Sequence, residues 1–227
     1  MRVNDIFYSL QGEGRNTGRA AVFVRFAGCN LRCAFCDTEF DTYRQMTAEE
    51  IVEAVKALVP QSQAQHPTGE AGGRLLAVLT GGEPTLQVDE AFVDLLHQHG
   101  FEVAMESNGT RPAPQNLDWL TVSPKRAFGG SGVREYGSIF GGTGVRGHGG
   151  TRLPDELKVV FDENTDPETY LVPPYPRTPV PPYLYLQPCD TGDAERNRAI
   201  TQACVEYIKQ HPEWRLSLQT HKLIDIP

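Results

Sequence analysis

The sequence lacks several features that mark membrane, secreted and nucleic-acid-binding proteins. No apolar run approaches the roughly twenty residues that a helix needs to span a bilayer, and no apolar segment of signal-peptide type follows residues 1–5. Basic residues are not in excess: 21 Lys and Arg stand against 29 Asp and Glu, and the net charge of -8 argues against a surface that tracks phosphates. We therefore expect a cytoplasmic protein with no membrane segment and no nucleic-acid partner.

Cysteine is also scarce, but three of the five cysteines lie together as Cys29, Cys33 and Cys36. In a reducing cytosol, clustered cysteines bind metal or do redox work more often than they form disulfides. Three thiolates on one short loop suit a soft metal or an iron–sulfur cluster. No second CxxC or HxxxH motif is present to close a tetrahedral zinc site, and Cys189 and Cys204 are single and distant. The spacing favours a three-thiolate cluster with an open position, and structural zinc remains the alternative.

Buried strands alternate with amphipathic helices along the chain. Residues 75–79 form a continuous apolar run, which is typical of a parallel strand buried on both faces. Further strands are expected at 21–27, 101–105, 117–122, 157–161 and 183–186, with helices after the capping box at 47–50, around 91–96 and over 194–210. The pattern predicts one α/β domain spanning 1–227, built as an incomplete (β/α) barrel of about six parallel strands. Residues 126–152 carry ten glycines and no periodicity, so we expect a loop insertion there, and a packed C-terminal region at 214–227.

Short polar motifs follow most of these strands. They are residues 11–14, 80–84, 106–110, 123–125 and 187–190. Because ligands bind at the carboxyl ends of parallel strands, we expect these motifs to gather at one mouth of the sheet. The spacing of residues 11–14 taken alone favours an ordinary glycine turn. Arg25 interrupts an apolar strand and needs an anion, which could be a carboxylate of the protein or one brought by a ligand.

The cysteine motif together with the TGGEP sequence at 80–84 resembles the radical S-adenosylmethionine (SAM) superfamily. The resemblance implies that Cys29, Cys33 and Cys36 hold a [4Fe-4S] cluster whose fourth iron is chelated by SAM. It also implies that Gly82 lies in the loop that contacts the SAM amino group, and that Phe35 packs near the adenine.

Within this superfamily the chain resembles the 7-carboxy-7-deazaguanine synthase family. The matching segments are 7–14, 23–31, 35–38, 106–109, 122–125, 156–160, 186–188 and 215–222. The resemblance implies a lyase that converts 6-carboxy-5,6,7,8-tetrahydropterin to 7-carboxy-7-deazaguanine with release of ammonia, in queuosine or 7-deazapurine biosynthesis, a tRNA modification pathway. The insertion at 126–152 departs from the compact members of that family.

The same resemblance assigns residues to the cofactor and to the substrate. The residues expected to bind the cofactor are Phe35, Cys36, Asp37, Gly82, Glu106, Ser123, Pro124, Lys125, Gln187, Pro188, Cys189 and Asp190. The residues expected to bind the substrate are Leu10, Gln11, Gly12, Glu13, Arg25, Thr80, Gln219, His221 and the C-terminal Pro227. Thr38 matches a Mg²⁺ position, where substrate oxygens and waters would complete the octahedron. The alternative is that Asp37 and Thr38 only cap a helix.

The resemblance also implies partners and leaves other functions to be weighed. A flavodoxin or ferredoxin is the expected reductant, and a homodimer is expected, with the apolar C-terminal third as its interface. Another radical SAM enzyme, such as an activase of glycyl-radical enzymes, would share the cluster and the TGGEP loop without needing Gln11, Glu13 and Arg25. A zinc-bound interaction module would be colourless and would not cleave SAM.

Overall fold

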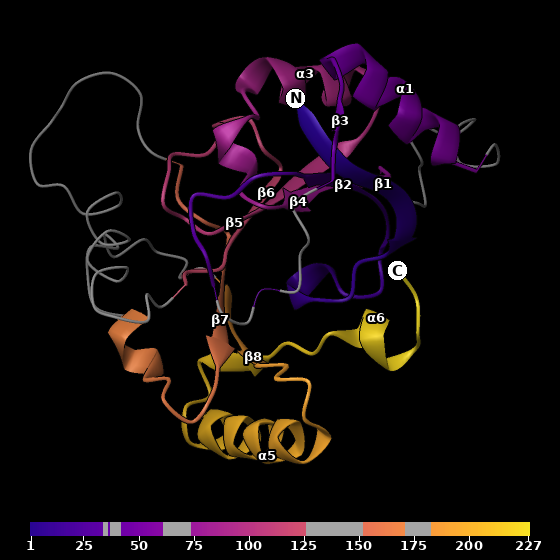
Figure 1. Ribbon diagram of the computed structural model, residues 1–227. Coiled ribbons are helices and arrows are strands. Elements are labelled where there is room, and N and C mark those ends of the chain that lie inside the picture. The colour runs from indigo at the N-terminus through magenta and orange to yellow at the C-terminus, as the bar shows by residue number, and fades with distance from the viewer. Residues whose placement is uncertain (34–35, 37–41, 61–73, 126–151, 171–182) are drawn as a thin grey trace, which may run out of the picture.

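The strands of the chain form one sheet with the order β3-β1-β2-β4-β5-β6-β7-β8-β9 (Figure 1). The structure is a computed structural model that describes residues 1–33, 36, 42–60, 74–125, 152–170 and 183–227. The strands are β1 (Arg2–Leu10), β2 (Ala20–Phe26), β3 (Arg44–Gln45), β4 (Leu76–Gly81), β5 (Glu102–Ser107), β6 (Trp119–Val122), β7 (Glu156–Phe161), β8 (Tyr183–Pro188) and β9 (Trp214–Leu216). The glycine-rich insertion predicted at 126–152 lies outside the described residues, except for residue 152.

The sheet is parallel over most of its width. β1 pairs antiparallel with β2 and with β3. The remaining pairs, β2–β4, β4–β5, β5–β6, β6–β7, β7–β8 and β8–β9, are all parallel. The predicted mostly parallel α/β architecture is therefore confirmed. β9 extends the parallel run at a place where the sequence predicts packing without naming a strand. The organisation as a single domain stays a prediction.

Helices cover the outer face of this sheet. They are α1 (Ala48–Leu58), α3 (Glu90–Gln98) and α5 (Ala194–Gln210). The short α6 (Thr220–Leu223) lies elsewhere, against the turn after β1, where Thr220 N–H donates to Gly12 O at 3.0 Å. The 3-10 turns are at Gly14–Asn16, Pro84–Leu86 and Pro167–Tyr170. α1 and α3 lie together over the first strands and α5 over the last ones (Figure 1). α1 begins at the predicted capping box, where the Thr47 hydroxyl accepts from Glu50 N–H at 3.2 Å and the Thr47 N–H donates to the Glu50 carboxylate at 2.8 Å. No helix in the described ranges is long and apolar enough to cross a membrane.

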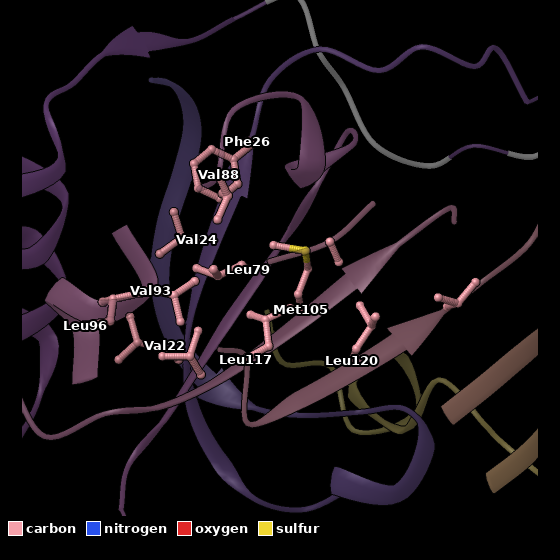
Figure 2. Close-up of a cluster of buried hydrophobic side chains, with 14 of the residues drawn as sticks. Val22, Val24, Phe26, Leu79, Val88, Val93, Leu96, Met105, Leu117 and Leu120 are labelled. Atoms are coloured by element: carbon pink, nitrogen blue, oxygen red, sulfur yellow. The ribbon is translucent and has the colours of Figure 1, made fainter. Parts of the chain in front are cut away.

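The hydrophobic core lies between the sheet and these helices. Side chains alternate between the two faces of a strand, so Val22, Val24 and Phe26 of β2 all point outward to the helices. Phe26 meets Phe92 of α3 edge to face, with ring centroids 6.4 Å apart. Figure 2 shows this cluster continuing across β4 and β5 through Leu79 and Met105. Burial of this apolar area, worth about 25 cal/mol per Å², fixes the helices on the sheet.

The inner face of the sheet changes character along the strands. Near the amino ends it is apolar, with a second buried cluster formed by Ala21, Phe23, Leu76, Val78 and Ala104. At the carboxyl ends the same face carries polar residues: Arg25, Thr80, Glu106, Lys158 and Gln187. The core therefore closes one end of the sheet and leaves a polar mouth at the other.

Candidate functional site

A pocket of about 730 Å³ opens at the carboxyl ends of the parallel strands. Its size falls in the range of small-molecule and cofactor sites. The predicted site residues Phe35, Asp37 and Thr38 lie outside the described residues. Of the others, all but Pro124 line this pocket, and Pro124 is buried between the lining residues Ser123 and Lys125. The tertiary structure therefore brings the predicted cofactor and substrate residues to one place.

The three clustered cysteines occupy one side of the pocket. Cys29 and Cys33 are partly buried and Cys36 is exposed, and Cys36 N–H donates to Cys33 O at 3.2 Å. The Cys29 sulfur accepts from Leu31 N–H at 3.4 Å and from the Asn108 amide at 3.8 Å. Burial raises the pKa of the Cys29 and Cys33 thiols, and the charge of Cys36 adds to that rise. A cation at this position would reverse the effect and stabilise all three as thiolates.

The loop after β4 is pinned directly against the chain that leads to the cysteines. Gly82 N–H donates to Phe26 O at 2.8 Å, and Glu83 N–H donates to Gly28 O at 2.9 Å. A Cβ atom at Gly82 would lie 2.0 Å from Gly28 O, so no larger residue fits without moving the backbone. This close approach leaves Gly82 at the pocket wall beside the cysteine loop.

Glu83 ties the ends of β4 and β5 together from beneath the pocket. Its side chain is fully buried and accepts from Ser107 Oγ at 2.8 Å, Asn108 N–H at 2.7 Å, and the N–H and hydroxyl of Thr85. Asn108 is thereby held where its amide reaches the Cys29 sulfur. The carboxylate of the TGGEP motif thus orders two of the loops that form the site.

Replacing Glu83 with alanine should destabilise the protein strongly. The change leaves buried N–H and hydroxyl donors without an acceptor, and each such group costs about 1–3 kcal/mol. We expect the free energy of unfolding to fall by about 3 kcal/mol or more, measured by urea denaturation. Glu53→Ala on the exposed face of α1 is the control and should leave the urea midpoint almost unchanged. Equal midpoints for the two variants would contradict this role of Glu83.

Arg25 lies beside the pocket on the inner face of β2. Its guanidinium sits over the Phe7 ring at 4.7 Å, and Phe7 stacks on Phe23 with centroids 5.0 Å apart. The strand register places Arg25 next to Thr80 of β4. Within the described residues no carboxylate forms an ion pair with Arg25. Its contacts in the described residues therefore favour the ligand anion, one of the two partners that the sequence leaves open for it.

A network of carboxylates, amides and one lysine lines another part of the pocket. Lys158 forms ion pairs with Glu13 and, at 3.4 Å, with Glu106. Gln11 donates to Glu106 at 2.9 Å, and Glu13 accepts from Gln219 at 2.9 Å and from Gln187 at 3.3 Å. Glu106 and Gln187 are predicted cofactor residues, yet their side chains contact predicted substrate residues.

In this network, the attraction between opposite charges offsets the effect of burial on the pKa values of Glu13 and Lys158. Burial alone would raise the pKa of Glu13, but the charge and hydrogen bond of Lys158 lower it to about 2. Burial alone would lower the pKa of Lys158, and the charges of Glu106 and Glu13 raise it above its ordinary value. Glu156, two residues before Lys158 on β7, has its pKa raised to about 7 by burial. Glu13 is thus an anion, and Lys158 a cation, at neutral pH.

Two further groups of predicted cofactor residues complete the wall. Lys125 donates to Ser123 Oγ at 2.8 Å just after β6. After β8, Asp190 pairs with Lys222 at 3.0 Å, and hydrogen bonds from Lys222 and from Gly192 N–H lower the pKa of Asp190 to about 2. Pro227 reaches the pocket from the other end of the chain, where its carbonyl oxygen accepts from Ser9 Oγ of β1 at 2.7 Å.

Sequence reasoning missed Lys158, although a signal for it exists. Lys158 is 4% exposed and interrupts the apolar run of β7, just as Arg25 interrupts the run of β2. A buried lysine needs anionic partners, so the argument made for Arg25 applies equally here. Asn108 was also missed as a contact of Cys29, because only the packing of two strand ends brings them together.

Comparisons with known proteins place the chain in a class and then in a family. A model of the radical SAM superfamily matches residues 23–127. The crystal structure of QueE from Escherichia coli has the same fold, with a TM-score of 0.67 and 25% identity over 96% of this chain and 92% of that one. Fold and cysteine motif therefore define the radical SAM class.

Two curated relatives define the family more narrowly. The 7-carboxy-7-deazaguanine synthase of Bacteroides thetaiotaomicron is 43% identical to this chain over 99% of this chain and 98% of its own length. That of Nitratidesulfovibrio vulgaris is 41% identical over 100% of this chain and 99% of its own length. The chain belongs to the 7-carboxy-7-deazaguanine synthase family of radical SAM enzymes.

The residues present fit the cofactors that this family implies. A [4Fe-4S] cluster takes cysteine thiolates as its protein ligands, and this chain offers three cysteine sulfurs on one loop at the pocket. Cys204 is buried in α5, and Cys189 follows β8, so neither belongs to that loop. Gly82 and the three cysteines line the same pocket, so a ligand bound there could contact both a cluster held by the cysteines and the loop after β4. A cluster with SAM on its open iron is consistent with this donor set.

Proposed function

We propose that the pocket binds SAM beside the cysteine loop and 6-carboxy-5,6,7,8-tetrahydropterin beside the lysine–carboxylate network. The reaction converts this pterin to 7-carboxy-7-deazaguanine with release of ammonia. The observation that carries the proposal is one pocket that joins three cluster-type cysteines to Arg25 and to fixed carboxylates. An activase of glycyl-radical enzymes would have no use for that second half of the pocket.

The chain's own residues would bind and orient the reactants. Cys29, Cys33 and Cys36 would hold the cluster, and when bound, the cluster and SAM supply the radical chemistry that begins the reaction. Arg25 would pair with the substrate carboxylate, a geometry for which a guanidinium is suited. Glu13 would accept hydrogen bonds from ring N–H or amino groups of the pterin, because it is held as an anion.

The remaining predicted assignments form part of the same proposal. Gly82, Ser123, Lys125 and the segment 187–190 would contact SAM, and Leu10, Gly12, Thr80, Gln219, His221 and Pro227 would contact the pterin. The contacts of Glu106 with Gln11 and Lys158 support a place next to the pterin instead of the cofactor.

The magnesium ligand, the reductant and the oligomeric state are also proposals. Thr38 would contribute one oxygen to Mg²⁺, with substrate oxygens and waters supplying the others. A flavodoxin or ferredoxin would reduce the cluster. A homodimer interface at the C-terminal region is supported by the exposed side chains of Leu223 and Ile224 on and after α6, which are 71% and 59% exposed.

Anaerobic reconstitution tests the function directly. The chain should take up about four irons, turn brown, and convert the pterin to 7-carboxy-7-deazaguanine in the presence of SAM and a reductant. Product is measured by ultraviolet absorbance and mass spectrometry. SAM cleavage with no pterin turnover would support a radical SAM enzyme and refute the proposed pterin substrate. A colourless protein that binds zinc would refute both the radical SAM activity and the substrate.

A further inference from the structure

Lys158 is buried and lines the pocket, between two carboxylates that come from different parts of the chain. Glu13 lies in the turn after β1, and Glu106 is the inner-face residue near the end of β5. Lys158 contacts both, and its side chain is only 5% exposed. Each carboxylate uses one oxygen for Lys158 and the other for glutamine amides.

This arrangement matters because a buried carboxylate without a cation takes up a proton. Burial and a neighbouring negative charge both disfavour the ionised form of a carboxyl group. The ionisable groups that face Glu13 come from every element packed against it, and they are Lys158 and Glu156 on β7, Glu106 on β5, Lys125 after β6 and His221 on α6. Lys158 forms an ion pair with Glu13, and its charge lowers the pKa of Glu13 more than the charge of His221 does.

We propose that Lys158 is a positioning residue: it keeps Glu13 and Glu106 ionised and aimed into the pocket, so that both act only as hydrogen-bond acceptors for the donor edge of the substrate. A pterin carries amino and ring N–H donors along one edge, and an ionised carboxylate accepts from two such donors at once. A protonated Glu13 would present an O–H donor to the donor edge of the pterin, and one of the hydrogen bonds to that edge would be lost. The inference rests on the proposed substrate and adds the group that sets its recognition.

The test replaces Lys158 with methionine, which keeps the length of the side chain and removes its charge. Infrared difference spectra of Lys158→Met against wild type at pH 7 should show the carbonyl stretch of a protonated carboxylic acid, and Lys158→Met/Glu13→Gln should lose or shift that band. The spectra need no substrate, no cluster and no activity. Absence of the band would overturn the proposal.

Binding of the pterin gives the second measurement. In wild type, the ionisation of Glu13 should add no pH dependence to the pterin Kd between about pH 6 and pH 9. The reason is that the pKa of Glu13 is about 2, so the group stays ionised throughout this range. In Lys158→Met the pKa is raised by burial, so Glu13 takes up a proton as the pH falls. We expect binding about tenfold to a hundredfold weaker at pH 6 and recovery toward pH 9, with the Kd for SAM unchanged.

Controls separate this inference from the proposed function and from misfolding. Wild-type protein that binds no pterin would refute the proposed function, and the infrared band would still decide whether Lys158 sets the charge of the carboxylates. If Lys158→Met does not fold, Lys158→Met/Glu106→Gln removes one of the two uncompensated charges and should still show a protonated Glu13. A variant whose pterin Kd and pH profile both equal those of wild type would overturn the positioning role.

Discussion

Alanine at Cys33 should leave a folded protein that neither assembles a four-iron cluster nor cleaves SAM. Cys33 lies on the pocket loop between Cys29 and Cys36, and a cluster of this type has no spare protein ligand to replace it. Loss of an outer-shell partner of a metal ligand already costs about 10–100-fold, so loss of the ligand itself should lower SAM cleavage by more than about a hundredfold. Iron content, electron paramagnetic resonance of the reduced cluster and release of 5′-deoxyadenosine measure the result.

The matched control for this experiment is Cys204→Ala. Cys204 is buried in α5, where burial alone raises the pKa of its thiol to about 12, so it is a packing residue and an inert thiol. This variant should keep its iron and its SAM cleavage while losing about 1 kcal/mol of stability. Full iron content and cleavage in Cys33→Ala would show that the three-cysteine site is misassigned.

Methionine at Arg25 should abolish tight pterin binding and leave SAM binding intact. The methionine stem can still cover the Phe7 ring, so the change removes mainly the charge and the hydrogen-bond donors. Loss of a charge-assisted pair in a desolvated site costs about 2–5 kcal/mol, which corresponds to a rise in the pterin Kd of about 30-fold to several thousandfold. SAM cleavage without pterin should continue at the wild-type rate.

A substrate analogue turns this prediction into a double-mutant cycle. Tetrahydropterin without the 6-carboxylate should bind wild type and Arg25→Met equally, because the two partners act only through each other. Arg19→Met is the control variant: Arg19 pairs with Glu102 at 2.7 Å outside the pocket, so it should lower stability and leave both Kd values unchanged. Equal losses for both ligands in Arg25→Met would show that Arg25 does not read the carboxylate.

The secondary structure of the described chain followed closely from periodicity. The apolar run at 75–79 lies in β4 (Leu76–Gly81), and the helix predicted at 194–210 is α5 (Ala194–Gln210), because apolar side chains must reach the core from a strand or a helix at the matching spacing. β1 (Arg2–Leu10) was not predicted as a strand, and its direction does not follow from periodicity either. Whether a strand pairs parallel or antiparallel depends on the path of its connection, which local sequence does not record.

The sequence by itself determined the chemistry that the pocket can hold. Three cysteines at fixed spacing define a thiolate site, and an arginine within an apolar strand requires an anionic partner. Both conclusions follow from the chemistry and charge of single residues. Only the tertiary structure decided which residues share a hydrogen bond: Lys158 with Glu13 and Glu106, and Gln11 with Glu106 across 95 positions of sequence. Ionisation depends on neighbours within a few ångströms, so the charge state of the carboxylates is a property of the fold.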